Sequence, residues 1–383
     1  MRKYIFIIFL LASWQFTLAQ NNACPIRISV LTCAPADELY ATFGHTAIRI
    51  IDSANRTDIV FNYGTFNFDD PDFYTKFIRG RLDYFLSIEQ YKDFLIQYIE
   101  DKRSIYEQEL NLTCLQKQQI INALSTNLQG ANRYYKYDFL FDNCTTRIRD
   151  IVFKNITAAT IPNAITAKGT TYRNMLHEYL DKGGKPWSKL GIDILLGSKT
   201  DEKVTTQQAM FLPDYLLKGL DSALLKKDTA HLVLNKQLIL QETPPNTAAY
   251  QYTPLLISSI ISILIILISF VQLGWAKITT QLIDSFLLYI TGIIGILLLF
   301  MWFATDHIVC TNNFNLCWAL PTNFFAAFFI WKKPTFIKKY FLIAAVITAL
   351  LLVSWLIIPQ QLNIALFPLA LAGLIRYIKL YQA

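Results

Sequence analysis

The sequence predicts a two-part protein, an α+β domain outside the cytoplasm followed by an all-α bundle of five transmembrane helices. Three observations support this prediction. A short apolar run follows two basic residues at the N-terminus, residues 24–240 mix strand and helix patterns, and residues 254–383 consist mostly of apolar stretches. Hydrophobic residues make up 53% of the 383 residues and charged residues only 16%. This composition excludes a disordered chain and argues against a fully water-soluble protein.

Residues 1–19 are typical of a secretory signal peptide. Arg2 and Lys3 precede an apolar run, and the segment ends at the small residue Ala19. We expect cleavage after Ala19. The alternative is an uncleaved anchor, but the apolar run is too short to span a bilayer comfortably. The mature chain would then begin outside the cytoplasm.

Five apolar stretches after residue 252 predict five membrane helices. A spanning helix needs about 20 apolar residues. The third stretch is the weakest candidate because it is short and contains Pro321. Residues 241–253 are predicted to be a linker into the membrane. The stretches lie near residues 254–275, 282–304, 316–331, 340–358 and 362–377.

The distribution of charge predicts how these helices are oriented. Residues 20–252 contain 26 basic and 26 acidic residues, whereas residues 253–383 contain seven basic and two acidic ones. If the first domain lies outside, all seven basic residues fall on the cytoplasmic side, as the positive-inside rule requires. The net charge of +7 therefore reflects topology and does not support nucleic-acid binding. We expect a multi-pass protein of the cell inner membrane, with the domain of residues 24–240 facing the periplasm.

Local patterns within residues 24–240 alternate between strand and helix. Alternating and β-branched segments predict strands at 26–33, 45–51, 58–66, 104–113 and 231–240. Helical patterns occur at 71–79, 88–102, 115–128 and 143–154. The last of these helices follows Asp142 and Asn143, two residue types favoured at helix N-caps.

The pair His45 and Cys144 is the strongest candidate for chemistry in the chain. Cys144 lies at the first turn of a predicted helix, where free backbone N–H groups favour a thiolate and can hold an oxyanion. His45 starts a predicted strand and would accept the thiol proton. Each residue alone is more often structural, but their contexts together favour a thiol nucleophile with a histidine base. No CxxC, HExxH, GxSxG or P-loop motif is present, so we expect no metal and no cofactor.

The other cysteines leave several pairings open. Cys24 and Cys33 could pair outside the cytoplasm, although a straight strand between them would hold them too far apart. Cys310 and Cys317 share an outer loop and could also pair. Cys114 is expected in the core.

The predicted outer loop 303–318 is unusually polar. Asp306, His307, Asn313 and Asn315 gather at the mouth of two membrane helices. The loop is either simply solvated or forms a polar rim that meets the catalytic domain or a lipid headgroup. We take Asp306, His307 and Asn313 as candidate substrate-binding residues.

Several motifs resemble the Lnb-type family. The segments FGHTAIRI and FNYGTFNF, followed by YDFLFDNCTTRIRD, resemble the Lnb-type periplasmic domain. Further matches are YRNMLHEYL, PWSKLGIDILLG and MFLPDYL, and the tail with TDH and NNFNLCWALPTN resembles the Lnb-type transmembrane region. The family includes lipoprotein N-acyltransferases. Its domain is similar to the permuted papain-like group that contains lecithin:retinol acyltransferase, in which the histidine precedes the cysteine, as His45 precedes Cys144 here.

The resemblance implies an acyl transfer. An acyl chain would move from the glyceryl group of a diacylglyceryl lipoprotein to the α-amine of its N-terminal cysteine, through a thioester on Cys144 with His45 as the base. The implied partners are diacylglyceryl lipoproteins or membrane lipid. The group that orients His45 is open, with Tyr63, Asn62 and Asp142 as candidates. Two other classes compete: a thiol hydrolase (cell-wall amidase, peptidase or lipase) and a non-enzymatic membrane scaffold.

Overall fold

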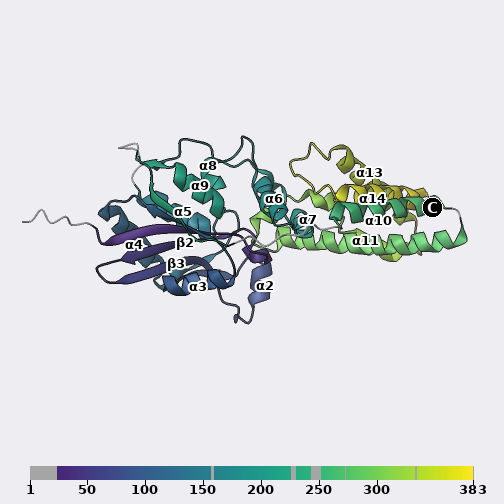
Figure 1. Cartoon of the computed structure of the whole chain (residues 1–383). Coiled ribbons are helices and arrows are strands. Elements are labelled where there is room, and N and C mark those ends of the chain that lie inside the picture. The colour runs from purple at the N-terminus through teal and green to yellow at the C-terminus, as the bar shows by residue number, and fades with distance from the viewer. Residues whose placement is uncertain are drawn as a thin grey trace, which may run out of the picture.

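The computed structural model describes residues 24–156, 159–225, 230–242, 252–271, 273–332 and 334–382. The predicted signal peptide, residues 1–19, lies outside the described residues, and so does most of the predicted linker, residues 241–253. An α+β part and a helical bundle lie end to end along the molecule (Figure 1).

A seven-stranded sheet, antiparallel throughout, forms the centre of the first part, in the order β6-β4-β3-β2-β1-β5-β9. The central strand β1 is buried on both faces, since Ile28 and Val30 belong to one core cluster and Leu31 and Cys33 to another. The nearly continuous apolar sequence of β1 follows from this burial. The strands are β1 (Ile26–Cys33), β2 (His45–Asp52), β3 (Thr57–Phe66), β4 (Asp83–Gln90), β5 (Ile105–Leu110), β6 (Tyr134–Lys136) and β9 (Val233–Leu240). A separate two-stranded sheet pairs β7 (Ala159–Thr160) with β8 (Leu224–Leu225).

Helices cover both faces of the large sheet. Buried side chains of α4 (Cys114–Asn127), α5 (Cys144–Asn155) and α9 (Pro213–Ser222) pack on the face that carries Ile28 and Val30. On the opposite face, α3 (Tyr91–Glu100) packs through Phe94 and Tyr98. The sheet domain also contains the short helices α2 (Phe73–Ile78) and α8 (Thr206–Ala209).

The five predicted strands correspond to β1, β2, β3, β5 and β9, and the predicted helices 71–79, 115–128 and 143–154 to α2, α4 and α5. The predicted helix over 88–102 is partly wrong, because β4 occupies residues 83–90 and α3 begins only at Tyr91. β4 pairs with β3 on one side and β6 on the other, and its Leu86 is fully buried. Tertiary pairing therefore overrides the local helical pattern.

A disulfide joins Cys24 to Cys114, with 5.6 Å between the two Cα atoms. Cys24 precedes β1, and α4 begins at Cys114 and packs against that strand. The expectation that Cys114 is a core residue is therefore wrong, and so is the possible pairing of Cys24 with Cys33. The cysteines Cys33, Cys144, Cys310 and Cys317 are free, so Cys310 and Cys317 do not pair either.

The bundle contains α10 (Pro254–Ile268), α11 (Gly274–Phe303), α13 (Thr335–Val353) and α14 (Leu366–Gln382). Among the described residues, α11 and α13 are the two helices long and apolar enough to cross a membrane, and α10 is a shorter apolar helix. The third predicted span is not a continuous helix. It contains the end of one 3₁₀ turn (Phe314–Cys317), the single-turn helix α12 (Asn323–Ala326) and a further 3₁₀ turn (Ala327–Phe329). Five continuous spanning helices are thus not confirmed.

Two features explain why the third stretch is irregular. Pro321 has no backbone N–H to donate within a helix. Asn323 is fully buried and donates to the hydroxyl of Tyr377, at 2.7 Å.

This irregular segment lies directly on α11, because a Cβ at Gly292 or Gly295 would come within 2.1 Å of its backbone. Glycines therefore permit a close contact that any other residue would block.

The two parts of the chain are joined by α6 (Tyr172–Lys182) and α7 (Pro186–Leu195), which lie between the sheet and the bundle (Figure 1). The buried Arg173 of α6 pairs with the buried Asp193 of α7, at 2.7 Å. Asn363, which precedes α14, donates to the other oxygen of Asp193 at 2.8 Å. A buried charge needs such partners to be tolerated, so this cluster fixes the sheet domain to the bundle.

A second contact at the junction is between backbones. Gly197 donates its N–H to the carbonyl of Val309 at 2.9 Å. A Cβ added at Gly197 would lie 1.9 Å from the carbonyl oxygen of Thr311. Real Cβ atoms essentially never come closer than 3.0 Å to such an atom. The loop that follows α11 is therefore packed against the chain after α7, with no room for a side chain between them.

Candidate active site

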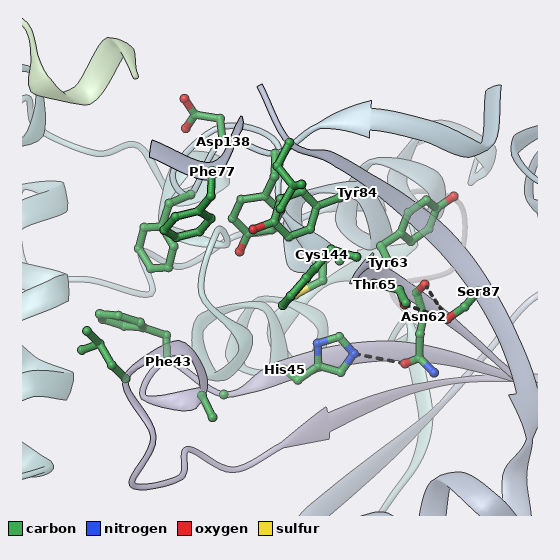
Figure 2. Close-up of a pocket in the computed structure, with 18 of the residues that line it drawn as sticks. Phe43, His45, Asn62, Tyr63, Thr65, Phe77, Tyr84, Ser87, Asp138 and Cys144 are labelled. Atoms are coloured by element: carbon green, nitrogen blue, oxygen red, sulfur yellow. Dashed lines mark hydrogen bonds between the residues drawn. The ribbon is translucent and has the colours of Figure 1, made fainter. Parts of the chain in front are cut away.

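His45 and Cys144 meet where α5 crosses the start of β2. His45 is the first residue of β2 and Cys144 is the first residue of α5. Their chain neighbours are also joined, since the hydroxyls of Thr46 and Thr145 lie 3.1 Å apart in the interior. The imidazole faces the thiol (Figure 2), and the charge of each group shifts the pKa of the other. Two side chains 99 positions apart in the sequence thus share one site.

Asn143 fixes the beginning of α5. Its side-chain oxygen accepts from the N–H of Thr146 at 2.8 Å, and its amide nitrogen donates to the carbonyls of Phe139 and Phe211 at 2.7 and 3.0 Å. The cap holds Cys144 at the first helical position. The N–H groups of Thr146 and Arg147 donate to Asn143, so among the described residues the N–H groups of Cys144 and Thr145 are the ones left for an anion.

Asn62 on β3 holds the imidazole from the side opposite the thiol. Its side-chain oxygen lies 3.1 Å from Nε2 of His45. This leaves Nδ1 as the ring nitrogen available to Cys144. A β-bulge follows Asn62, and the next glycine, Gly64, has a φ of 92° and lies beside Cys144. The bulge thus allows the helix start to approach the strand closely.

The other two candidates for orienting His45 have different partners. The hydroxyl of Tyr63 accepts a hydrogen bond from Asn127 at 2.7 Å, and the carboxylate of Asp142 pairs with Arg147 at 2.6 Å. Of the three residues that the sequence offered, Asn62 is the one that contacts the ring.

The electrostatic environment favours an ion pair. Burial by itself would raise the pKa of the Cys144 thiol, but the charge of His45 and hydrogen bonds from His45, the Thr46 N–H and Thr145 lower that pKa to about 7. Burial by itself would lower the pKa of His45, but the thiolate and the Asn62 oxygen raise it above its usual value. The pair therefore favours a thiolate beside an imidazolium near neutral pH.

The thiol opens into a cavity of about 820 Å³. Phe43 and Phe77 lie on the side of Cys144 away from Asn62 (Figure 2). His307 and Val309, from the loop that follows α11, complete the lining. The size and largely apolar lining are typical of a site for a small ligand or chain. The membrane part of the protein contributes directly to the wall.

A polar group behind Asn62 was not among the sequence-based candidates. Glu89 of β4 accepts a hydrogen bond from the amide of Asn62 and lines the cavity. Burial raises the pKa of Glu89 above its usual value. No local signal distinguishes this residue, because it lies in a segment that the sequence predicts as helix.

The three candidate substrate-binding residues have different surroundings. His307 lines the cavity, and its Nε2 lies 3.2 Å from the carbonyl oxygen of Phe77. Asp306 does not line the cavity and pairs instead with Arg81 at 2.9 Å. Asn313 is buried away from the cavity and donates to the carbonyls of residues 194 and 195. The loop therefore meets the sheet domain, and one of the three candidates reaches the site.

No group of three or more His, Cys, Asp or Glu side chains within the described ranges is arranged to hold a metal ion.

Two family models match the chain. The Lnb N-terminal periplasmic domain matches residues 13–178, and the Lnb transmembrane domain matches residues 246–383. A search of curated proteins and one of solved structures found no match. The first matched range contains His45 and Cys144, and the second contains His307. The resemblance noted in the sequence is confirmed, and the chain belongs to the Lnb-type family, as a membrane protein with a periplasmic domain.

Proposed function

We propose that the protein is a thiol-dependent acyltransferase of the membrane. It moves an acyl chain from the diacylglyceryl group of a bacterial lipoprotein to the α-amine of the lipoprotein's N-terminal cysteine. The observation that carries the proposal is the Cys144–His45 pair, which opens into an apolar cavity walled partly by the membrane part of the chain. Membership of the Lnb-type family supports a lipoprotein-processing enzyme of the acyltransferase type.

The first half of the reaction forms a thioester. The Cys144 thiolate attacks the carbonyl carbon of a glyceryl ester, and the tetrahedral oxyanion is held by the first backbone N–H groups of α5. The bond between carbonyl carbon and glyceryl oxygen then breaks. The imidazolium of His45 gives its proton to the leaving oxygen, which becomes a free hydroxyl. Asn62 keeps the ring in place during this transfer, through its bond to Nε2.

The second half returns the enzyme to its starting state. The neutral α-amine attacks the thioester carbon, the carbon–sulfur bond breaks, and an amide forms on the lipoprotein. Neutral His45 takes the proton released by the amine, which restores the thiolate–imidazolium pair. An α-amine has a pKa of ~8, so part of it is neutral at physiological pH. Exclusion of water from the apolar cavity favours transfer over hydrolysis.

The same proposal includes the arrangement of the chain in the cell. Residues 1–19 are a signal peptide, residues 24–240 form the periplasmic thiol-enzyme domain, and residues 254–383 form the multi-pass part in the inner membrane, with a cytoplasmic C-terminus. The order of His45 before Cys144 supports the permuted papain-like arrangement for the periplasmic domain. Glu89 joins Asn62 as a positioning residue.

Tandem mass spectrometry of a synthetic diacylglyceryl lipopeptide tests the reaction. The purified full-length protein should convert it to an isomer of unchanged total mass, in which fragmentation shows one acyl chain on the α-amine. Cys144→Ala should abolish this product, whereas Cys317→Ala, at another partly buried free cysteine, should retain it. Thermal unfolding curves of both variants establish that each remains folded.

Other outcomes point to the competing classes. A thiol hydrolase acting as a lipase would release a fatty acid, so the lipopeptide would lose the mass of one acyl chain. A peptidase or amidase would cleave the peptide part. If the protein were a non-enzymatic scaffold, cells with the Cys144→Ala variant would show the same lipoprotein acylation as cells with the unmodified protein. Any of these results would refute acyl transfer.

A further inference from the structure

Four large side chains near the junction of sheet domain and bundle are exposed together. Phe68, Tyr74, Phe77 and Ile78 follow β3 or belong to α2, and we call them the junction patch. Tyr74 is 78% exposed and Phe68 71%, which matches the 74% of Phe303, the last residue of the membrane-spanning helix α11. A soluble domain rarely gathers such side chains on one surface without a partner.

The junction patch rests on a stacked aromatic base. The ring of Phe73 lies 5.3 Å from that of Phe68 and 6.1 Å from that of Phe77, measured between centroids. Both carboxylate oxygens of Asp70 accept from Lys76 of α2. The exposed rings are therefore presented by a packed surface and not by a loose loop.

The loop that leaves α11 holds this surface at the membrane boundary. Asp306, three residues after the end of α11, donates its N–H to the carbonyl of Arg79 at 2.9 Å and pairs with Arg81 at the same distance. Three extended residues reach ~10 Å. α11 is long and apolar enough to span a membrane, and with α11 so placed α2 lies close to the plane in which that helix emerges. Figure 1 shows α2 beside this junction.

One basic side chain beside the junction patch is placed to meet a lipid headgroup. The Nε of Arg79 is buried and has no hydrogen-bond partner within the residues that the structure describes. The Arg79 side chain as a whole is half-buried, so its terminal nitrogens, and not the buried Nε, are the donors that a lipid phosphate would approach. The same segment contains Asp69, Asp70 and Asp72, so it carries no net positive charge. Its exposed aromatic side chains are the feature that it shares with surfaces that meet lipid headgroups.

We propose that the junction patch is a membrane-contact surface. Its aromatic side chains insert among the headgroups of the outer leaflet, and Arg79 binds a lipid phosphate there. Phe77 also lines the cavity that contains Cys144, so the surface adjoins the entrance of the site. In combination with the proposed function, a lipid-anchored substrate would pass from the bilayer to the thiol without crossing water.

Site-specific photocrosslinking tests this proposal. Benzoylphenylalanine replaces Tyr74, Phe303 or Leu115 in the full-length Cys144→Ala chain, one position at a time, so that labelling does not depend on acyl transfer. Leu115, 70% exposed at the start of α4, is the matched control on the sheet domain away from the bundle. The protein is reconstituted in nanodiscs of phosphatidylethanolamine and phosphatidylglycerol and illuminated, and adducts are identified by intact mass.

We expect severalfold more lipid adduct at position 74 than at position 115. Strong labelling at position 303 shows that the protein is correctly inserted. Labelling at position 74 no higher than at 115, while position 303 is labelled, would overturn the proposal. So would a crosslink from position 74 to a second copy of the chain in place of lipid. Loss of acyl transfer in the lipopeptide assay would leave these results unchanged, so the two proposals fail separately.

Discussion

Alkylation of Cys144 should report the ion pair with His45 directly. A pKa of about 7, against an ordinary 9.0, makes about half of the thiol a thiolate at pH 7, instead of roughly 1%. The difference is worth roughly 3 kcal/mol. His45→Ala removes the charge and the hydrogen bond that lower this pKa but leaves the burial that raises it. The thiolate population at pH 7 should then fall by at least roughly 50-fold.

The assay follows iodoacetamide labelling of the full-length protein between pH 5 and 10, resolved by peptide mass spectrometry. The Cys144 rate should rise as pH increases through 7 and be lost as pH falls below it, because only the thiolate reacts. Cys33 and Cys310 are internal controls, since burial raises the pKa of each to about 12 and both should stay unlabelled over this range. The midpoint is the decisive quantity, because a thiolate of lower pKa is also a weaker nucleophile.

Either of two results would refute this reasoning. The first is a midpoint near 9 for the unmodified chain, which would mean that burial outweighs the imidazole. The second is an unchanged midpoint in His45→Ala. Folding of the variant is checked by the persistence of unlabelled Cys33 and Cys310, which become reactive when the chain unfolds.

Three further predictions rest on other contacts. Asn62→Ala should lower the rate of acyl transfer roughly tenfold in the lipopeptide assay, because it removes one buried hydrogen bond worth ~1–1.5 kcal/mol. An unchanged rate would show that the imidazole needs no such support. The double variant Cys24→Ser with Cys114→Ser removes a disulfide between residues 90 positions apart. It should lower the free energy of unfolding by ~4–5 kcal/mol and therefore lower the Tm. A Tm equal to that of the parent chain would contradict this prediction. Gly197→Ala should lower the Tm of the full chain and make the junction sensitive to limited proteolysis. The control Gly191→Ala should do neither, because a Cβ at that position meets nothing within 4 Å. Equal behaviour of the two variants would mean that the loop contact is dispensable.

The sequence was most informative where local pattern and tertiary structure agree. The strand that starts at His45 and the helix that starts at Cys144 were both predicted, because apolar periodicity and an N-cap residue define them locally. Thiol chemistry depends on a helix start, so the location of Cys144 could be predicted too. Among the three candidates beside His45, Asn62 could not be singled out, because hydrogen-bond geometry depends on register and not on residue type.

Features that depend on long-range contacts were missed or wrong. β4 lies between β3 and β6, and only that pairing makes residues 83–90 a strand. Glu89 therefore could not be placed beside Asn62. The disulfide from Cys24 depends on α4 packing against β1, which no spacing in the sequence reveals. The third membrane stretch was apolar enough for a helix, but Pro321 and the buried Asn323 prevent a continuous one.

The carboxylate of Asp193 has a consequence for how such proteins can evolve. One of its oxygens binds Arg173 of α6, and the other accepts the amide of Asn363, 170 positions later. Residue 193 also lies between the ranges matched by the two family models. Recombination that exchanged the bundle for an unrelated one would leave a buried carboxylate oxygen without its donor, a loss of ~1–3 kcal/mol or more. A chimera whose new bundle has no donor at position 363 should therefore be less stable than the parent chain by about this amount.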